Sequence, residues 1–457
     1  MMPFLIGFCG CAGPAYTPDS AWQERSPLGA GIKTFVPPPE PPGSVREAID
    51  IDDPKGPVTL RYALSLALMR SPALEGTAWD IRVGEAKKLQ EGLYQNPTVG
   101  MAIGGVNSSA FFPQLEYTSG ISQTFELGKH EKKSRVAALE KDLAGWDYET
   151  RRLDVLTGTV KFFVEVLEAQ EQMALYDELV RTSEQILDLA TEKDRTKRDM
   201  AGAVKPADNN GSKDRPEIIK AEIHVYNARV QREQAQAKLE AARRRLAATW
   251  GQTPPTFEKA EGVLSEVSPV PPFQDLSEMI YQNPDVARWN KEVEQRRAAL
   301  ELEKAKRIPD VTLSGGVQQF NDGSGTGPFF GASMPLPIFD RNQGNILGAR
   351  YKLEKVGAES RDAALKALTS LSNAYLALAS SYTEAKGLKT EVVPAYERFF
   401  NACYQLLLKE KSGVSDVVDT HQALFEARAK YNEVLAAYHK SKADVERLIG
   451  QSLEKVN

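Results

Sequence analysis

The stretch that decides the fold is Gln114–Leu127, which reads QLEYTSGISQTFEL. Its odd-numbered residues are mostly apolar, and its even-numbered residues are all polar or glycine. This alternation has a period of two residues and indicates a β-strand with one apolar and one polar face. A shorter strand is expected over Thr98–Val106, and residues 107–113 fit a hairpin loop between the two.

Long helical segments surround this hairpin. Helices are predicted from Thr59 and from Ala73 to Tyr94, ahead of the strands. Behind the strands, Lys129–Arg198 contains no proline. A helix of that length would span on the order of 100 Å, which no compact domain needs. The loop Gly202–Pro216 breaks it, and a return helix is expected from Ile218 to Trp250.

The chain then repeats this organisation. Pro72 and Pro284 are 212 positions apart, as are Pro97 and Pro309. After Pro309 the pattern predicts a strand, a glycine-rich loop, a second strand, a long helix kinked at Pro394, and a return helix. The corresponding ranges are 311–318, 321–327, 328–339, 345–411 and 414–450.

The predicted divisions follow from this repeat. They are a signal-peptide remnant over 1–11, a proline-rich extended segment over 12–57, a first repeat over 58–255, a second repeat over 256–451 and a tail over 452–457. Within the remnant, Gly10-Cys11 resembles the end of a bacterial lipoprotein signal, which makes Cys11 a candidate for lipidation. The alternative is an ordinary exported protein with a truncated or misassigned start.

Composition excludes several classes of function. Charged residues make up 26% and apolar residues 42%, the balance of a folded protein. The net charge of −5 gives no electrostatic basis for binding nucleic acid. The four histidines, His130, His224, His421 and His439, are scattered along the sequence without a ligand spacing. We therefore expect no catalytic site, no bound metal and no cofactor.

Four strands per chain predict an oligomer. No stretch approaches the roughly 20 apolar residues of a spanning helix, so a membrane crossing would require a β-barrel. Four strands cannot close a barrel. Two copies would give eight strands whose side chains nearly fill the interior, and three copies would give twelve strands and a lumen. The long helices are heavily charged and must project into water, paired as coiled coils with the return helices.

Three segments carry a resemblance to a known family. They are Val58–Leu68 with Ser71–Leu74, Met334–Gly344 and Ala436–Gly450. In these segments the chain resembles the TolC family of outer-membrane efflux proteins, in the branch associated with heavy-metal and related resistance-nodulation-division exporters. Together with the duplication, the likeness covers roughly residues 58–451.

The resemblance implies a mainly α fold with membrane β-strands. The expected assembly is a TolC-like homotrimer whose twelve-stranded β-barrel, four strands per chain, continues into a long α-helical coiled-coil barrel. It implies a Gram-negative outer membrane with a large periplasmic part. The partners would be outer-membrane lipid, a periplasmic adaptor and an inner-membrane pump. The function would be passive exit of metal ions or small toxic compounds from a tripartite efflux system.

The resemblance also suggests site residues. Gly413-Val414-Ser415 would be the second hairpin tip, which contacts the adaptor, and Gly202–Pro216 would be the first tip. Asp416 and Asp419 lie three apart and share a helix face, so a trimer could form acidic rings that gate the periplasmic entrance. Both carboxylates also suit stabilisation of a helix start, and the two roles are compatible.

Aromatic pairs and two other functions complete the expectations. Phe111, Phe112, Phe329 and Phe330 are candidates for an aromatic girdle at the outer interface, with loop packing as the alternative.

One alternative function is the outer-membrane duct of a type I secretion system. The other is a periplasmic coiled-coil adaptor without a barrel, which the alternation in Gln114–Leu127 disfavours.

Overall fold

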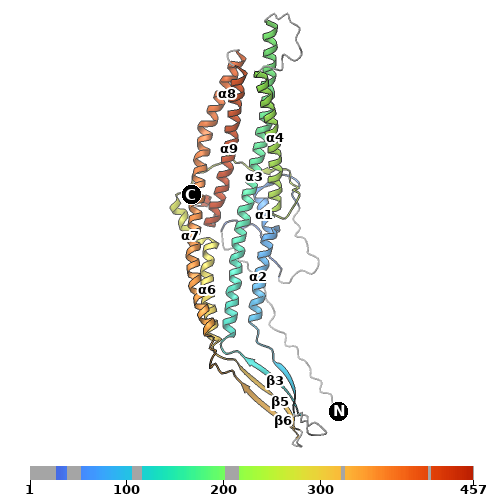
Figure 1. Ribbon diagram of the computed structural model, residues 1–457, viewed down its shortest axis with the longest axis vertical. Coiled ribbons are helices and arrows are strands. Elements are labelled where there is room, and N and C mark those ends of the chain that lie inside the picture. Colours follow the sequence, from blue (N-terminus) through green and yellow to red (C-terminus); the bar gives the residue numbers. More distant parts are fainter. Residues whose placement is uncertain are drawn as a thin grey trace, which may run out of the picture.

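The computed structural model describes residues 27–38, 53–104, 116–200, 216–320, 325–409 and 413–455. The molecule is strongly elongated, with a β-sheet at one end and long helices that run from it to the other end (Figure 1). No helix in these ranges is both long and apolar enough to cross a bilayer.

Both halves of the chain place their elements in the same order. The first half contains α1 (Leu60–Arg70), α2 (Pro72–Glu91), β2 (Thr98–Gly104), β3 (Glu116–Phe125), α3 (His130–Met200) and α4 (Pro216–Ala248). The second half contains α5 (Phe273–Met279), α6 (Pro284–Ala305), β5 (Val311–Phe320), β6 (Gly325–Ser333), α7 (Gln343–Gly387), α8 (Val393–Leu408) and α9 (Val414–Ile449). Short strands β1 (Val58–Thr59) and β4 (Ala260–Glu261) pair in parallel, which ties the starts of the two halves together.

Prolines and caps set the helix boundaries. Pro72 and Pro284 each occupy the first turn of a helix, where a missing N–H costs nothing. The Asn283 side chain accepts a hydrogen bond of 2.7 Å from the Asp285 backbone N–H and so caps α6. At the far end, Gly450 takes a φ of 73° and ends α9 in the left-handed conformation.

The kink predicted at Pro394 is present. α7 ends at Gly387, one π-helical turn (η2, Leu388–Val392) follows, and α8 begins at Val393. Proline lacks an N–H, and its ring crowds the carbonyl four residues earlier, here that of Thr390. A wider turn relieves this crowding, which accounts for the position of η2.

The four main strands form one antiparallel sheet in the order β2-β3-β5-β6. The strand predicted over 328–339 is wrong at both ends, because β6 covers Gly325–Ser333. The loop predicted over 321–327 was accordingly too long. Pro335 and Pro337 follow the end of β6, and proline cannot donate a hydrogen bond to a neighbouring strand.

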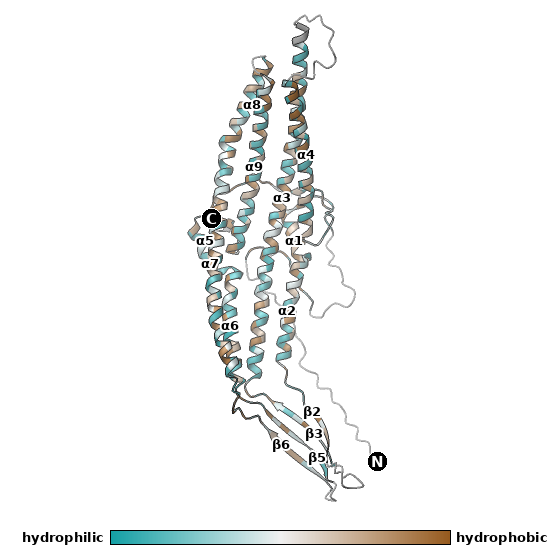
Figure 2. Ribbon diagram, in the orientation of Figure 1, coloured by the Kyte–Doolittle hydropathy of each residue, from teal (hydrophilic) through white to brown (hydrophobic). Residues whose placement is uncertain are grey.

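The helical body is held by seams of apolar side chains around α3. This helix packs against α4 along one part of its length and against α2, α6 and α9 along others. One large cluster joins both halves through fully buried residues such as Val166, Leu246 and Phe257, with Val434 of α9 beside them. Figure 2 shows the result, helices that carry both polar and apolar residues along their whole length.

Candidate functional site

The sheet has one exposed apolar face. The strand register places the odd-numbered residues of β2, β3 and β5 on this face together with the even-numbered residues of β6. The large apolar side chains that this face exposes are Val99, Met101, Ile103, Tyr117, Ile121, Phe125, Leu313, Val317 and Phe330. Met101 is 84% exposed and Phe330 is 88% exposed. An apolar surface of this extent marks an interaction with lipid or protein.

The opposite face consists mostly of polar residues and glycine, with Ala102 and one aromatic ring among its described side chains. Phe329 lies over Gly120 and Gly316, where a Cβ on Gly316 would come within 2.7 Å of the ring. Thr124 and Thr312 share a hydrogen bond of 2.9 Å on the same face. Phe329 and Phe330 therefore point to opposite sides of the sheet.

The four girdle candidates therefore differ in position. Phe330 lies on the apolar face and Phe329 on the polar one, while Phe111 and Phe112 lie outside the described residues. The aromatic girdle stays a prediction, and Phe330 is the candidate among the described residues whose face suits it.

The outer edges of the sheet are unpaired. Among the described strands, β2 pairs only with β3, and β6 pairs only with β5. Each edge thus presents a row of backbone N–H and C=O groups, which is a template for pairing with another strand.

The end of the second hairpin carries the predicted tip. Gly413 lies where α8 turns into α9, and Lys220 of α4 reaches it from the first half of the chain. The Lys220 ammonium lies 2.6 Å from Ser415 Oγ and 2.7 Å from Asp419 Oδ2. Asp416 and Asp419 are both exposed. Of the two gate candidates, Asp419 is thus held by a cation from α4.

A groove of about 420 Å³ lies beside this junction. Its lining residues come from α3, from the start of α4 and from Val414 of α9, namely Ala190, Lys193, Asp194, Pro216, Glu217, Ile218 and Val414. The first predicted tip falls on residues 201–215, outside the described part of the chain.

Two histidines that are far apart in the sequence meet in the structure. His224 Nε2 lies 2.9 Å from His421 Nδ1, and both rings are buried. A signal for this pairing exists, because both residues lie about two turns from the start of a return helix in the duplicated frame. In the described ranges, no group of three or more His, Cys, Asp or Glu side chains is arranged to hold a metal ion.

Residues 27–38 of the proline-rich segment lie along the helical body. The Leu28 N–H donates to the Gly450 carbonyl at 3.2 Å, and the Phe35 N–H donates to the Leu68 carbonyl at 3.1 Å. Gly29 has a φ of +72°, and a Cβ there would lie 2.7 Å from Leu156 Cδ1. Cys11 lies outside the described residues.

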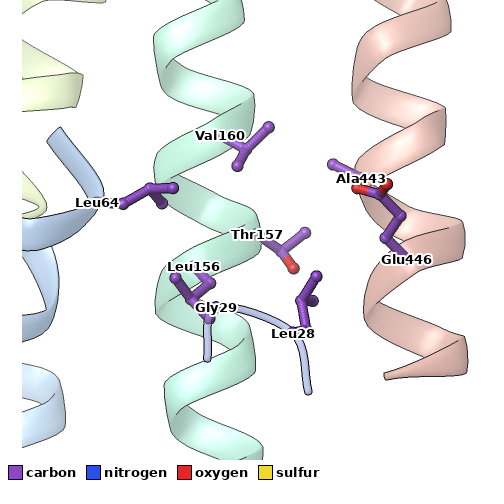
Figure 3. A pocket seen from close by; sticks show the side chains of 8 residues that line it. All are labelled: Leu28, Gly29, Leu64, Leu156, Thr157, Val160, Ala443 and Glu446. Carbon is purple, nitrogen blue, oxygen red and sulfur yellow. The ribbon is translucent and has the colours of Figure 1, made fainter. Parts of the chain in front are cut away.

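A cavity of about 70 Å³ remains beneath this segment, between α1, α3 and α9 (Figure 3). Leu28, Leu156 and Val160 give it an apolar lining, and Glu446 closes one side. Burial raises the pKa of Glu446, whose Oε1 accepts hydrogen bonds from the Ser452 hydroxyl and the Leu453 N–H. The space is too small for a substrate, so we assign it to packing of the segment.

Comparison with known proteins gives a family match in the second half of the chain. The model of the outer membrane efflux protein family matches residues 276–451. The prediction of a TolC-like outer-membrane efflux protein is thereby confirmed, and the protein is an efflux channel rather than an enzyme. The alternatives of a secretion duct or an adaptor gain no support.

Two relatives come from Cupriavidus metallidurans. The cobalt-zinc-cadmium resistance protein CzcC is 28% identical over 397 residues, which cover 87% of this chain and 91% of CzcC. The nickel and cobalt resistance protein CnrC is 24% identical over 330 residues, which cover 70% of this chain and 74% of CnrC.

Solved structures show the same fold. CusC superposes with a TM-score of 0.72 at 16% identity, covering 86% of this chain and 92% of CusC. The CmeC outer membrane channel of Campylobacter jejuni gives a TM-score of 0.67 at 15% identity, with coverage of 86% and 85%. The MtrE outer membrane channel of Neisseria gonorrhoeae gives 0.69 at 18% identity, with coverage of 86% and 89%.

Proposed function

We propose that three copies of this efflux protein form a passive duct that carries metal cations across the periplasm and the outer membrane. It would receive them from an inner-membrane pump through a periplasmic adaptor. The observation that carries this proposal is the four-stranded sheet, with an exposed apolar face, a polar face and two unpaired edges. Such a sheet is incomplete as a monomer and suits the wall of a barrel in lipid.

Strand directions support closure between copies. Because the four strands alternate in direction, β6 of one copy would run antiparallel to β2 of the next. Three copies would supply twelve strands, enough to leave a lumen, whereas eight strands leave an interior that side chains nearly fill. The polar face would then line the lumen, and the apolar face would contact lipid.

Exposed apolar stripes on the helices support the same assembly. On α4, Ile223 and Tyr226 are 55% and 68% exposed, and on α8 Phe399 is 56% exposed. On α4 the exposed apolar residues include Ile219, Ile223 and Tyr226, and on α8 they include Tyr396, Phe399 and Leu406. Spacings of three, four and seven residues keep each of these sets on one helix face. We propose that α8 of one copy packs against α4 of the next, which would extend the barrel as a wall of helices.

The site residues take their roles within this assembly. The tip at Gly413, Val414 and Ser415 would contact the adaptor, and carboxylates near it would form the gate. Asp416 and Asp419 are the two gate candidates, and Asp419 pairs with Lys220. Lipidation at Cys11 and a girdle at Phe330 would anchor the barrel in the membrane.

The metal cargo rests on the two relatives, whose names specify resistance to cobalt, zinc, cadmium and nickel. The test is to delete the gene for this chain and to measure growth inhibition by these four metals, with the wild-type gene restored on a plasmid as control. We expect tolerance to at least one metal to fall on deletion and to return on complementation. Unchanged tolerance to all four, in cells that express the partner pump, would contradict a metal cargo.

A further inference from the structure

The buried contact between His224 of α4 and His421 of α9 joins the two halves of the chain close to the hairpin ends. Their nitrogens, Nε2 and Nδ1 respectively, lie 2.9 Å apart. A neutral imidazole carries one N–H and one acceptor nitrogen, so this contact requires that one ring donate and the other accept. His421 is 0% exposed and His224 is 6% exposed. The pair is thus a buried hydrogen bond that depends on protonation state.

The surroundings of the pair are aromatic and dry. The ring centroids of Phe400 on α8 and Phe425 on α9 lie 5.2 Å and 4.7 Å from that of His421. The other nitrogen of His421, Nε2, is buried with no hydrogen-bond partner among the described residues. A second positive charge here would be buried without an adjacent acceptor to stabilise it.

Every element packed around the pair contributes charged groups, which are Lys220 on α4, Asp419 and Arg428 on α9, Glu178 on α3 and Glu397 on α8. Lys220 is paired with Asp419 at 2.7 Å. Arg428 lies 2.7 Å from Glu397 and 3.3 Å from Glu178. The carboxylates near the pair are therefore already engaged by cations on neighbouring helices.

Burial is the main influence on both histidines. It lowers the pKa of His421 to about 3, and the charges of His224 and Arg428 act in the same direction. Burial also lowers the pKa of His224, where Asp419 opposes the effect and Lys220 adds to it. The folded protein thus holds both rings neutral at a pH where exposed histidines begin to take up protons.

We propose that the His224–His421 contact is an acid-sensitive latch between the two helical hairpins. While the pair contains a neutral ring, α4 and α9 are held together at this level. When both rings carry a proton, two N–H donors with positive charge face each other, the hydrogen bond is lost and the helices separate. The link from Lys220 to Ser415 and Asp419, about one turn nearer the tip, then loses its support.

The direction of the effect follows from linkage. Both histidines have a lower pKa in the folded chain than the roughly 6.5 of an unfolded chain, so below that pH the unfolded chain binds more protons. The stability that the pair contributes is present above pH ~6.5 and falls as the pH falls below it. Acid therefore loosens the latch, and alkali does not.

The test measures the separation directly in the full-length protein in detergent. Spin labels replace the exposed Glu222 on α4 and Glu426 on α9 through p-acetylphenylalanine, which leaves the cysteines unlabelled. Unlabelled chain is added in excess, so that distances within one chain dominate. We expect the mean label distance from double electron–electron resonance to lengthen as the pH falls from about 7.5 to about 3, the pKa of His421.

The decisive variant is His224→Gln/His421→Asn, whose amides occupy the positions of Nε2 and Nδ1 and hydrogen-bond without titrating. It keeps every carboxylate, and its label distance should stay constant over the same pH range. The matched control is His439→Gln, which removes a half-buried histidine of α9, and its label distance should lengthen as that of the wild type does. Equal lengthening in the wild type and the double variant, or none in the wild type, would overturn the latch.

A second measurement needs no mutation. Hydrogen exchange at the imidazole C2 position, followed by mass spectrometry, reports the titration of each histidine in the wild-type protein. We expect His224 and His421 to titrate below the roughly pH 6.5 of a histidine in an unfolded chain. Titration of His421 at or above that pH would overturn the proposal.

Discussion

The sheet and the helical body use apolar side chains in opposite ways. In the sheet, Met101 and Phe330 are among the most exposed large apolar residues of the described chain. In the body, Leu246 and Phe257 are completely buried. A single chain therefore completes its helical core but leaves its sheet open to lipid and to neighbouring strands. One copy can therefore fold its helical core alone, whereas its sheet needs lipid and neighbouring copies.

The largest expected effect comes from a charge on the apolar face of the sheet. Ile121→Lys should abolish assembly in the outer membrane, since a Lys at mid-membrane costs about 2–4 kcal/mol in each copy. Assembly is measured as the fraction of heat-modifiable oligomer in outer-membrane preparations. The matched control is Ser122→Lys on the polar face of the same strand, which should assemble. Equal assembly of both variants would remove the distinction between the faces.

A truncation in the helical core should have the next largest effect. Leu246→Ala should lower the free energy of unfolding by about 2–5 kcal/mol, because it leaves a cavity at a fully buried site. Glu222→Ala, at an exposed position of the same helix, should change it by less than about 0.5 kcal/mol. Thermal unfolding of the detergent-solubilised protein compares the two. A small loss of unfolding free energy in Leu246→Ala would mean that the helical body is not tightly packed around this residue.

A smaller effect should come from the glycines beneath Phe329. A Cβ on Gly316 would lie 2.1 Å from the Ser119 carbonyl oxygen and 2.6 Å from Gly120 Cα. Gly316→Ala should therefore destabilise the sheet by about 1–3 kcal/mol, since backbone must shift to admit the methyl group. Gly100→Ala meets nothing within 4 Å and should be tolerated. Urea denaturation of the barrel in detergent would compare the stabilities of the two variants. Equal urea midpoints for Gly316→Ala and Gly100→Ala would contradict the close approach of the backbone at Gly316.

The smallest effect concerns the gate and leaves folding unchanged. Asp416→Asn and Asp419→Asn should each weaken the cation preference of single channels in planar bilayers, because each removes a carboxylate near the periplasmic entrance. An unchanged preference in Asp416→Asn would exclude this carboxylate from the gate and leave it the role of stabilising the start of α9.

Much of the fold follows from local sequence. Pro72, Pro97 and Pro309 mark boundaries because proline restricts the backbone around it, and α3 was expected to within two residues of its ends. The alternation in Gln114–Leu127 gave the faces of β3 correctly, because the side-chain period of a strand is local.

What could not be predicted depends on long-range contacts. The pairing of β1 with β4 joins residues about 200 positions apart through two residues of each strand, too short to leave a pattern. The end of β6 was missed because alternation continues past Ser333 while hydrogen bonding stops. At the candidate sites, sequence located Gly413 and Asp419 but not Lys220 or the His224–His421 contact, which come from packing α4 against α9.

The central claim is that the sheet becomes a barrel wall with its apolar face in lipid. The direct test is cysteine scanning of β3 in intact outer membranes with a charged maleimide, taking the labelling of the unsubstituted chain as background. Cysteines at Thr118, Ser122 and Thr124 should label from the aqueous lumen, whereas those at Tyr117, Ile121 and Phe125 should be protected. Uniform labelling along the strand, without a period of two, would contradict the account.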